Sequence, residues 1–203
     1  GNVLYDDSVV ASPFPAGPLA TWVAAFLAGK ALERDGAVIL LDLNRKPLRR
    51  LEWLGGAIFS IAFPALDAGV GKQAGRFTSA IRPTTTRDVG GGGQQFTSPQ
   101  AKTKAWNAGN FAMSIPGIDC TRVMRVEPVV VTQTYLAPGS GRGAAMPGPV
   151  AVSDLVVTVG QSGVSDFVRW IEDFVAAGNS SKIHEKAATI HYLAPNLRDE
   201  IGS

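Results

Sequence analysis

The chain has little of the side-chain chemistry on which enzymes and metal proteins depend. Its 203 residues include one cysteine, Cys120, and only two histidines, His184 and His191. A lone cysteine excludes an intramolecular disulfide, and two histidines without a third ligand at a suitable spacing do not predict a zinc site. So few groups also give no basis for arguing a Ser/His/Asp or Cys/His arrangement. We therefore expect a protein that is not an enzyme and that holds no metal and no cofactor.

Long apolar runs and a strong net charge are also missing. The longest apolar stretches, such as AVILL and AIFSIAF, are too short to cross a bilayer. The first residues, GNVLYDDSVV, lack the basic and apolar regions of a signal peptide. The net charge is +2, and the Lys and Arg residues are scattered. We therefore expect no membrane partner and no specific nucleic-acid binding.

Glycine and proline, in contrast, are plentiful. The chain contains 23 glycines and 13 prolines, which separate short apolar runs, and 45% of its residues are hydrophobic. This pattern predicts a β-rich α+β protein with many turns. A hairpin is expected over 36–53, and the other strands are expected at 5–12, 57–63, 76–88, 150–160 and 186–193.

Two segments repeat one amphipathic helix pattern. LATWVAAFLAG (19–29) and FVRWIEDFVAAG (167–178) carry large apolar residues at matching positions, with a constant offset of 148 residues. The spacing i, i+3, i+4, i+7 predicts helices at about 18–31 and 164–177, each with one buried face. We expect these faces to be anchored by Leu19, Trp22, Val23, Phe26 and Leu27 in the first helix and by Phe167, Trp170, Ile171, Phe174 and Val175 in the second.

The repeat extends beyond the helices. At the same offset YDDSVVAS corresponds to SDLVVTVG, and ERDGAVILLDLN corresponds to HEKAATIHYLAPN with a slip of a few residues. The order strand, helix, strand, turn is therefore predicted twice. Residues 1–88 then form the C-terminal part of a first repeat, and residues 110–203 form the N-terminal part of a second. The Gly-rich, polar segment 89–109 is interpreted as the linker between them.

Neither predicted copy has a full set of flanking strands. The first has no counterpart of 110–150, and the second has no counterpart of 52–88. Incomplete copies imply open sheet edges, whose unpaired N–H and C=O groups recruit further strands. Either the chain is a fragment of a longer tandem protein, or neighbouring chains supply the missing strands. Both interpretations predict assembly.

The second copy resembles a known family of assembling proteins. The stretch VSDLVVTVGQSGVSDFVRWIEDFVAAGNSSKIHEKAATIHYLAPNLRDE is similar to the phage tail tube proteins, including those of contractile tails and phage-like injection systems. That family also places a tryptophan-bearing helix after a strand, followed by a Gly-containing turn and a hairpin. The matching pieces are Trp170, Gly178-Asn179 and 188–196 in the second copy and Trp22 and Gly29-Lys30 in the first. The likeness covers most of 5–88 and 110–200.

The resemblance implies both a fold and a function. It implies two related tail-tube-like β-sandwich or barrel units, each with one packed amphipathic helix, in a structural protein that forms hexameric rings stacked into a tube. The implied partners are copies of the chain itself, together with tail sheath, baseplate or other tube-ring proteins. The protein would be assembled in the bacterial cytoplasm as a component of a virion tail or phage-like particle, with nucleic acid at most passing through a lumen.

The tandem duplication departs from a plain tube subunit and leaves the exact role open. A main tube protein, a specialised ring at a baseplate or cap, and a related filament-forming protein are the alternatives within the family. A rival from another class is a non-enzymatic β-barrel module that binds a small apolar ligand or a protein. A third alternative is a hydrolase whose geometry the sequence does not reveal.

Four residues outside the helices are candidate contacts between subunits. Trp106 is a lone aromatic in a polar segment, a type of residue that anchors many interfaces. Pro138, Arg142 and Met146 belong to the loop 137–149, whose Gly and Pro content suits an extended contact with a neighbouring ring.

Overall fold

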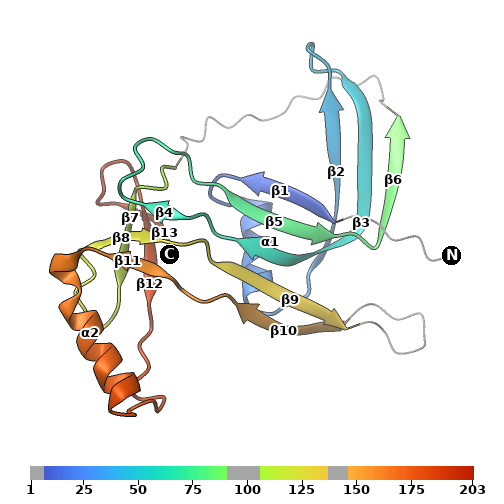
Figure 1. Ribbon diagram of the computed structural model, residues 1–203. Coiled ribbons are helices and arrows are strands. Elements are labelled where there is room, and N and C mark those ends of the chain that lie inside the picture. Colours follow the sequence, from blue (N-terminus) through green and yellow to red (C-terminus); the bar gives the residue numbers. More distant parts are fainter. Residues whose placement is uncertain (1–6, 91–105, 137–145) are drawn as a thin grey trace. The chain divides into compact units, whose positions relative to one another are not determined.

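The computed structural model describes residues 7–90, 106–136 and 146–203 of the chain (Figure 1). Antiparallel strands form most of the described elements, and helices are few, which confirms the β-rich α+β class. Among the described helices, none has the length and hydropathy needed to span a membrane. The expected contact residues Pro138 and Arg142 lie outside the described residues.

The chain divides into two compact units that interleave along the sequence. Unit 1 contains Gly1–Phe63, Arg76–Lys104 and Val130–Ser153, and unit 2 contains Pro64–Gly75, Ala105–Val129 and Asp154–Ser203. The predicted division around a linker at 89–109 does not coincide with these units. A short segment from the predicted first repeat belongs to unit 2, and a longer one from the predicted second repeat belongs to unit 1.

Unit 1 is organised around one long strand, β3 (Pro47–Ala62). Its C-terminal half pairs with β5 (Phe77–Arg82) on one side and β9 (Val130–Leu136) on the other. Its N-terminal half pairs with β2 (Glu33–Leu41) and β6 (Thr85–Gly90). The strands β1 (Ser8–Ser12) and β10 (Met146–Val152) extend the sheet through β5 and β9, respectively.

Some strands expected from the sequence have other boundaries than the strands of the structure. The expected hairpin 36–53 and the expected strand 57–63 share the continuous strand β3, because Gly55 and Gly56 bend the strand without ending it. The expected strand 76–88 consists of β5 and β6, and the expected strand 150–160 consists of the end of β10 and β11 (Val157–Val159).

The helix α1 (Pro18–Leu27) covers the core of unit 1. It begins with Pro18 in the first turn, where the missing N–H is not needed. It ends in a Schellman motif, in which the Lys30 N–H donates to the Ala25 carbonyl and the Gly29 N–H, with Gly29 at φ 70°, donates to the Phe26 carbonyl, both at 2.9 Å. The core beneath the helix is formed by Trp22, Val23, Phe26, Trp53, Ile58, Ile61, Ile81 and Val131.

Unit 2 contains two small sheets and one helical segment. The first sheet has the order β11, β8 (Val123–Val126), β4 (Leu66–Asp67), and the second has the order β13 (Glu200–Gly202), β12 (Thr189–Leu193), β7 (Phe111–Ser114). A short 3-10 turn, η1 (Gln161–Gly163), leads into α2 (Ser165–Ile171), which continues as a π-helical segment, η2 (Glu172–Ala176).

Trp106 is a core residue of unit 2. Its side chain is buried and packs edge-on against Tyr192, with ring centroids 5.2 Å apart. Its backbone carbonyl accepts a hydrogen bond from the Gly75 N–H at 2.9 Å, so the indole ring lies against Gly75. The interpretation of Trp106 as an exposed contact between subunits is therefore wrong, because the strand segment at Ala74 and Gly75 covers it within its own unit.

The close approach of Gly75 to Trp106 gives a first prediction. A Cβ at residue 75 would lie 1.8 Å from Cζ3 of Trp106, so we expect Gly75→Ala to lower the free energy of unfolding by about 1–3 kcal/mol. Gly71 is the matched control, because a Cβ there meets nothing within 4 Å. Urea unfolding followed by far-UV circular dichroism measures both variants, and equal stability of the two would contradict the packing described.

Candidate functional site

Part of unit 1 projects as a ribbon without a hydrophobic core. Figure 1 shows β2, the first half of β3 and β6 side by side, and these elements are called the arm here. Cross-strand partners share a face of a sheet, so Val38, Leu40 and Leu51 lie on one face of the arm. These three side chains are all exposed. An exposed apolar surface on an uncovered sheet is typical of a surface that another protein covers.

Ion pairs hold the strands of the arm together. Arg87 Nε donates to Glu52 Oε2 at 3.1 Å, and Arg49 Nε donates to Asp88 Oδ2 at 2.9 Å. The hydrogen bond from Arg87 lowers the pKa of Glu52, and that from Arg49 lowers the pKa of Asp88, each against a smaller effect of desolvation. These pairs join β3 to β6 in addition to the backbone hydrogen bonds of the sheet.

The base of the arm is fixed by Trp53. Its indole ring lies between two glycines, since a Cβ at Gly36 or Gly56 would approach the ring to 2.2 Å or 2.6 Å. The adjacent Gly55 has φ 59°, a conformation that side chains rarely adopt. The change of partners halfway along β3 therefore occurs at residues that only glycine fits.

The first predicted helix face is largely confirmed. Trp22, Val23 and Phe26 are buried, and Leu19 packs against the same core as a partly buried residue. Trp22 Nε1 also donates a hydrogen bond to the Leu32 carbonyl at 2.6 Å, which ties α1 to the start of the following strand. Leu27 is 44% exposed, so its expected role as an anchor is wrong.

The second predicted helix face is confirmed only in part. Phe167 is buried, and the half-buried rings of Trp170 and Phe174 meet edge-on with centroids 6.4 Å apart. Ile171 is 57% exposed and Val175 is 70% exposed, so neither is the anchor that the sequence predicted. The aromatic residues define the inner face of this helix, and the aliphatic residues turn away from it.

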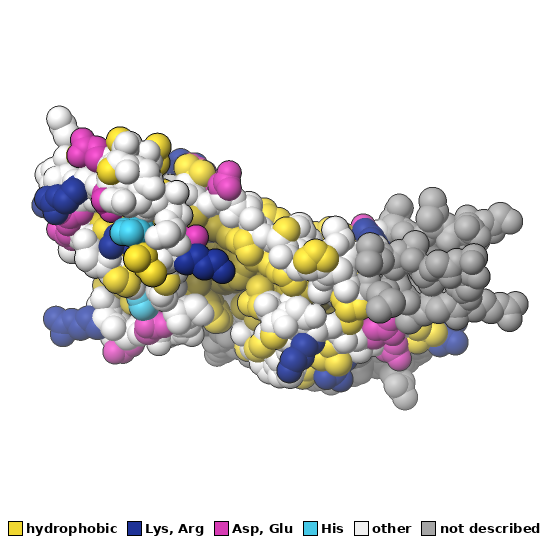
Figure 2. Space-filling model, turned by 90° about the horizontal axis from the view of Figure 1, so that it is seen from below, with side chains coloured by type: hydrophobic (Ala, Val, Ile, Leu, Met, Phe, Trp, Pro, Cys, Tyr) yellow, Lys and Arg dark blue, Asp and Glu magenta, His cyan; other side chains and the backbone are white. Residues whose placement is uncertain are grey.

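The outward residues of the second helix form a continuous apolar stripe. Val164, Val168, Ile171 and Val175 are spaced i, i+4, i+7, i+11, which places them on one side of the helix, and all are exposed. This set is called the α2 stripe. Figure 2 shows that hydrophobic side chains gather in patches at the surface rather than lying singly among charges. The α2 stripe has the spacing expected of a helix that packs on a partner.

The indole N–H of Trp170 distinguishes the two helices. In α1 the corresponding Trp22 N–H has an acceptor, the Leu32 carbonyl. Trp170 Nε1 is buried and has no hydrogen-bond partner among the described residues. A buried donor without an acceptor costs free energy, so the tryptophans at matching positions of the two helices differ in whether their N–H is satisfied.

Met146 lies at the start of β10, where its backbone pairs with Leu136. The expected contact at Met146 is thus placed in a strand of unit 1 and not in a free loop. Beside this strand, the buried Gln133 donates through Nε2 to the Gly148 carbonyl at 3.1 Å, which fixes the hairpin of β9 and β10.

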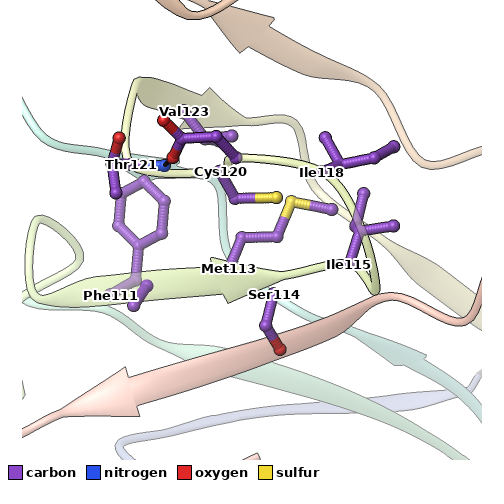
Figure 3. A pocket seen from close by; sticks show the side chains of 10 residues that line it. Phe111, Met113, Ser114, Ile115, Ile118, Cys120, Thr121 and Val123 are labelled. Carbon is purple, nitrogen blue, oxygen red and sulfur yellow. Dashed lines mark hydrogen bonds between the residues drawn. The ribbon is translucent and has the colours of Figure 1, made fainter. Parts of the chain in front are cut away.

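A hollow of about 390 Å³ lies between β7 and the turn that follows it. In Figure 3 the sulfur atoms of Met113 and Cys120 lie close together on its inner side, with Ile115 and Ile118 beside them. Burial raises the pKa of the Cys120 thiol, which favours its protonated form. Burial also raises the pKa of Tyr192 to about 12, which keeps its phenol neutral in the core of unit 2.

Three polar side chains come together on the outer surface of the second sheet of unit 2. Ser114 Oγ is 3.0 Å from His191 Nε2, and His191 Nδ1 is 2.9 Å from Glu200 Oε2. The residues lie on β7, β12 and β13, respectively, and the pairing of Ala112 with His191 and of Ser114 with Thr189 sets the diagonal contact. In Figure 3 the Ser114 side chain points away from Met113 and Cys120.

Sequence reasoning missed this cluster. Ser114 and His191 are 77 residues apart, and only the register of the sheet brings them together. The sequence offered one signal. With only two histidines, the chain has few positions at which a serine–histidine contact could form. Within the described part of the chain, no group of three or more His, Cys, Asp or Glu residues is arranged to hold a metal ion.

No family model, no curated protein and no solved structure matches the chain.

The two indole N–H groups provide a second prediction. Trp22→Phe removes the donor to the Leu32 carbonyl, so we expect it to lower the free energy of unfolding by about 1–2 kcal/mol more than Trp170→Phe. Both changes remove the same atoms, and only the first breaks a hydrogen bond between described residues. Urea unfolding monitored by circular dichroism compares them, and a larger loss in Trp170→Phe would show that the donors are assigned wrongly.

The arm provides a third prediction. A carboxyl whose pKa is lowered in the folded chain stabilises the fold at pH values above its ordinary pKa of 4.5. This stabilisation is lost as the pH falls through the lowered pKa. We expect amide exchange in β6, corrected for intrinsic rates, to increase as pH falls below this range. Glu52→Gln should reduce the pH dependence and leave the part that the Asp88–Arg49 pair contributes, whereas the exposed Glu185→Gln should keep it in full. A β6 whose protection is independent of pH in the parent chain would contradict the role of the Glu52–Arg87 pair.

Proposed function

We propose that the chain is a structural subunit that assembles with copies of itself into rings or a stacked tube of the phage tail or phage-like injection type. The observation that carries the proposal is the exchange of strands along the chain. The segment 64–75 follows part of unit 1 in the sequence but belongs to unit 2, where β4 pairs with β8. In the same way, β9 follows part of unit 2 in the sequence but pairs with β3 in unit 1. The same kind of strand addition joins separate subunits edge to edge when the added strand comes from another chain.

The order of elements supports a tandem origin. Strand β1, helix α1 and the hairpin of β2 and β3 follow one another in unit 1. Strand β11, helix α2 and the hairpin of β12 and β13 follow in the same order in unit 2, and both hairpins are antiparallel. This correspondence supports two copies of one building block.

The differences between the copies support assembly. In unit 1 the strand β1 pairs with β5, and the core of Ile58, Ile61 and Ile81 lies under α1. In unit 2 the corresponding strand β11 pairs with β8, the α2 stripe is exposed, and Trp170 Nε1 has no acceptor among the described residues. We infer that a second copy covers the helix of unit 2, as a sheet covers the helix of unit 1.

The resemblance to tail tube proteins gives this assembly a form. Three chains of two repeats would fill a ring of six units, and stacked rings would form a tube. The arm is a surface available to neighbouring rings, sheath or baseplate proteins. In this proposal the chain is part of a virion tail or phage-like particle, assembled in the bacterial cytoplasm.

One observation favours the second candidate function, a non-enzymatic binding module. The hollow beside β7 is lined mainly by apolar side chains, including Phe111, Met113 and Ile118, which suits a small apolar ligand. It lies within one small sheet and its turn, whereas the strand exchange involves both units. We therefore place the assembly proposal first.

The fourth prediction tests the assembly proposal at the α2 stripe. We expect the parent chain to form oligomers well above 21.3 kDa in light scattering and rings or tubes in negative-stain microscopy. Ile171→Lys and Val175→Lys place a charge in an apolar contact. Each should therefore raise the concentration at which the monomer assembles at least tenfold, a loss of about 1.4 kcal/mol in the free energy of association.

Ala176→Lys is the matched control, because it adds the same charge to an exposed position next to the stripe. It should leave the oligomer unchanged, and all three variants should keep the melting temperature of the parent monomer. A parent chain that stays monomeric at high concentration would refute the assembly proposal. Oligomers that tolerate both stripe variants would refute the role of the stripe alone.

A further inference from the structure

We propose that Ser114, His191 and Glu200 form a hydrolytic site for short-chain carboxylic esters, an activity separate from assembly. The contacts of 3.0 Å and 2.9 Å place a hydroxyl nucleophile, a base and an orienting carboxylate in sequence. Nucleophilic catalysis requires this order, with each pair within hydrogen-bond reach. The three side chains come from three neighbouring strands, so the sheet itself holds them in register.

The protonation states follow from the partners. An ionised carboxylate only accepts hydrogen bonds, so the proton between Glu200 and His191 lies on Nδ1. In the neutral imidazole Nε2 then has a free lone pair, which accepts the Ser114 O–H. The hydrogen bond from His191 lowers the pKa of Glu200, with a further contribution from Ser203, so the carboxylate is ionised at neutral pH. This is the tautomer that a general base needs.

The surroundings indicate the class of substrate. Ser114 is exposed, and the side chain of His191 is 29% exposed, so a substrate reaches both from solvent. The residue paired with His191 is Ala112, whose small side chain leaves the surface beside the imidazole open. The Ser114 side chain points away from Met113 and Cys120, which line the apolar hollow. Such a site suits a small acyl group with a good leaving group and not a long chain.

A cation lies at the same end of β7. Lys186 Nζ donates to the Pro116 carbonyl at 3.0 Å, two residues beyond Ser114. Lys186 also precedes Thr189, the strand partner of Ser114, by three residues. Lys186 therefore adds a positive charge near the turn that follows β7.

The reaction balances with an ester and water. Ser114 Oγ adds to the carbonyl carbon while its proton moves to His191 Nε2, and the C–O bond then breaks as the leaving alcohol takes that proton. The acyl group remains on Ser114. Water next adds to this acyl carbon and gives a proton to His191, and the proton returns to Ser114 Oγ as the carboxylic acid leaves.

The chain contains an internal comparison for this site. Ser181 Oγ lies 3.0 Å from His184 Nδ1, so it forms a serine–histidine pair of the same length. No acidic side chain contacts the other nitrogen of His184 among the described residues. Figure 2 shows histidine side chains (cyan) at the surface. If contact with histidine alone activated a serine, both serines would react.

Hydrolysis of p-nitrophenyl acetate by the full chain tests the proposal. We expect the parent to turn over the ester, with Ser114→Ala and His191→Gln each slower by about 10²-fold or more and Glu200→Gln also slower. Ser181→Ala should keep the parent rate. A parent chain no faster than Ser114→Ala would overturn the proposal, as would loss of the activity in Ser181→Ala.

A second measurement does not depend on turnover. A fluorophosphonate probe should label Ser114 and spare Ser181, as located by mass spectrometry of the peptides. In Ser114→Cys, the new thiol should react with iodoacetamide faster than in the same variant carrying His191→Gln. Equal alkylation rates in these two folded variants, or labelling of Ser181 in preference to Ser114, would overturn the site.

Discussion

The backbone hydrogen bonds between β3 and its four partner strands are the interaction on which unit 1 depends. A strand has only two edges, so four partners require a long strand that changes neighbours halfway. The change occurs at Gly55 and Gly56, beneath the ring of Trp53. Apart from Trp53, the residues that β3 contributes to the core under α1 come from its C-terminal half. The N-terminal half is therefore left to form the arm, whose faces have no core of their own and whose strands are joined by ion pairs.

Local patterns in the sequence predicted the elements that depend on local interactions. The helix α1, its buried residues Trp22, Val23 and Phe26, and the hairpin of β2 and β3 follow from periodicity and turn residues. Contacts between distant residues were not predictable in this way. The sequence gives no sign that Leu66 and Asp67 pair with β8, or that β9 pairs with β3. Trp106 was misplaced for the same reason, since its partners Gly75 and Tyr192 lie far along the chain.

The candidate sites also depend on contacts that local sequence patterns do not predict. The α2 stripe and the aromatic face share one helix, and periodicity alone did not decide which of them faces inward. The serine, histidine and glutamate of the second sheet in unit 2 meet only because of the strand register. The chain has one cysteine and two histidines, so these reactive groups are few. A small number of reactive groups does not imply that these groups lie far from other polar side chains.

The interleaved order of the two units also bears on how the chain is made. Ser60 in β3 pairs with Thr132 in β9, so this edge of β3 has no partner until the ribosome has added the later strand. Unit 2 in turn uses 64–75, which is made long before the strands of 154–203 that share its unit. Neither unit reaches its final form while the nascent chain is short. Pairings of such wide separation slow folding and leave strand edges exposed meanwhile. Vectorial synthesis therefore favours completing both units together, once the strands of 130–153 and 154–203 have been made.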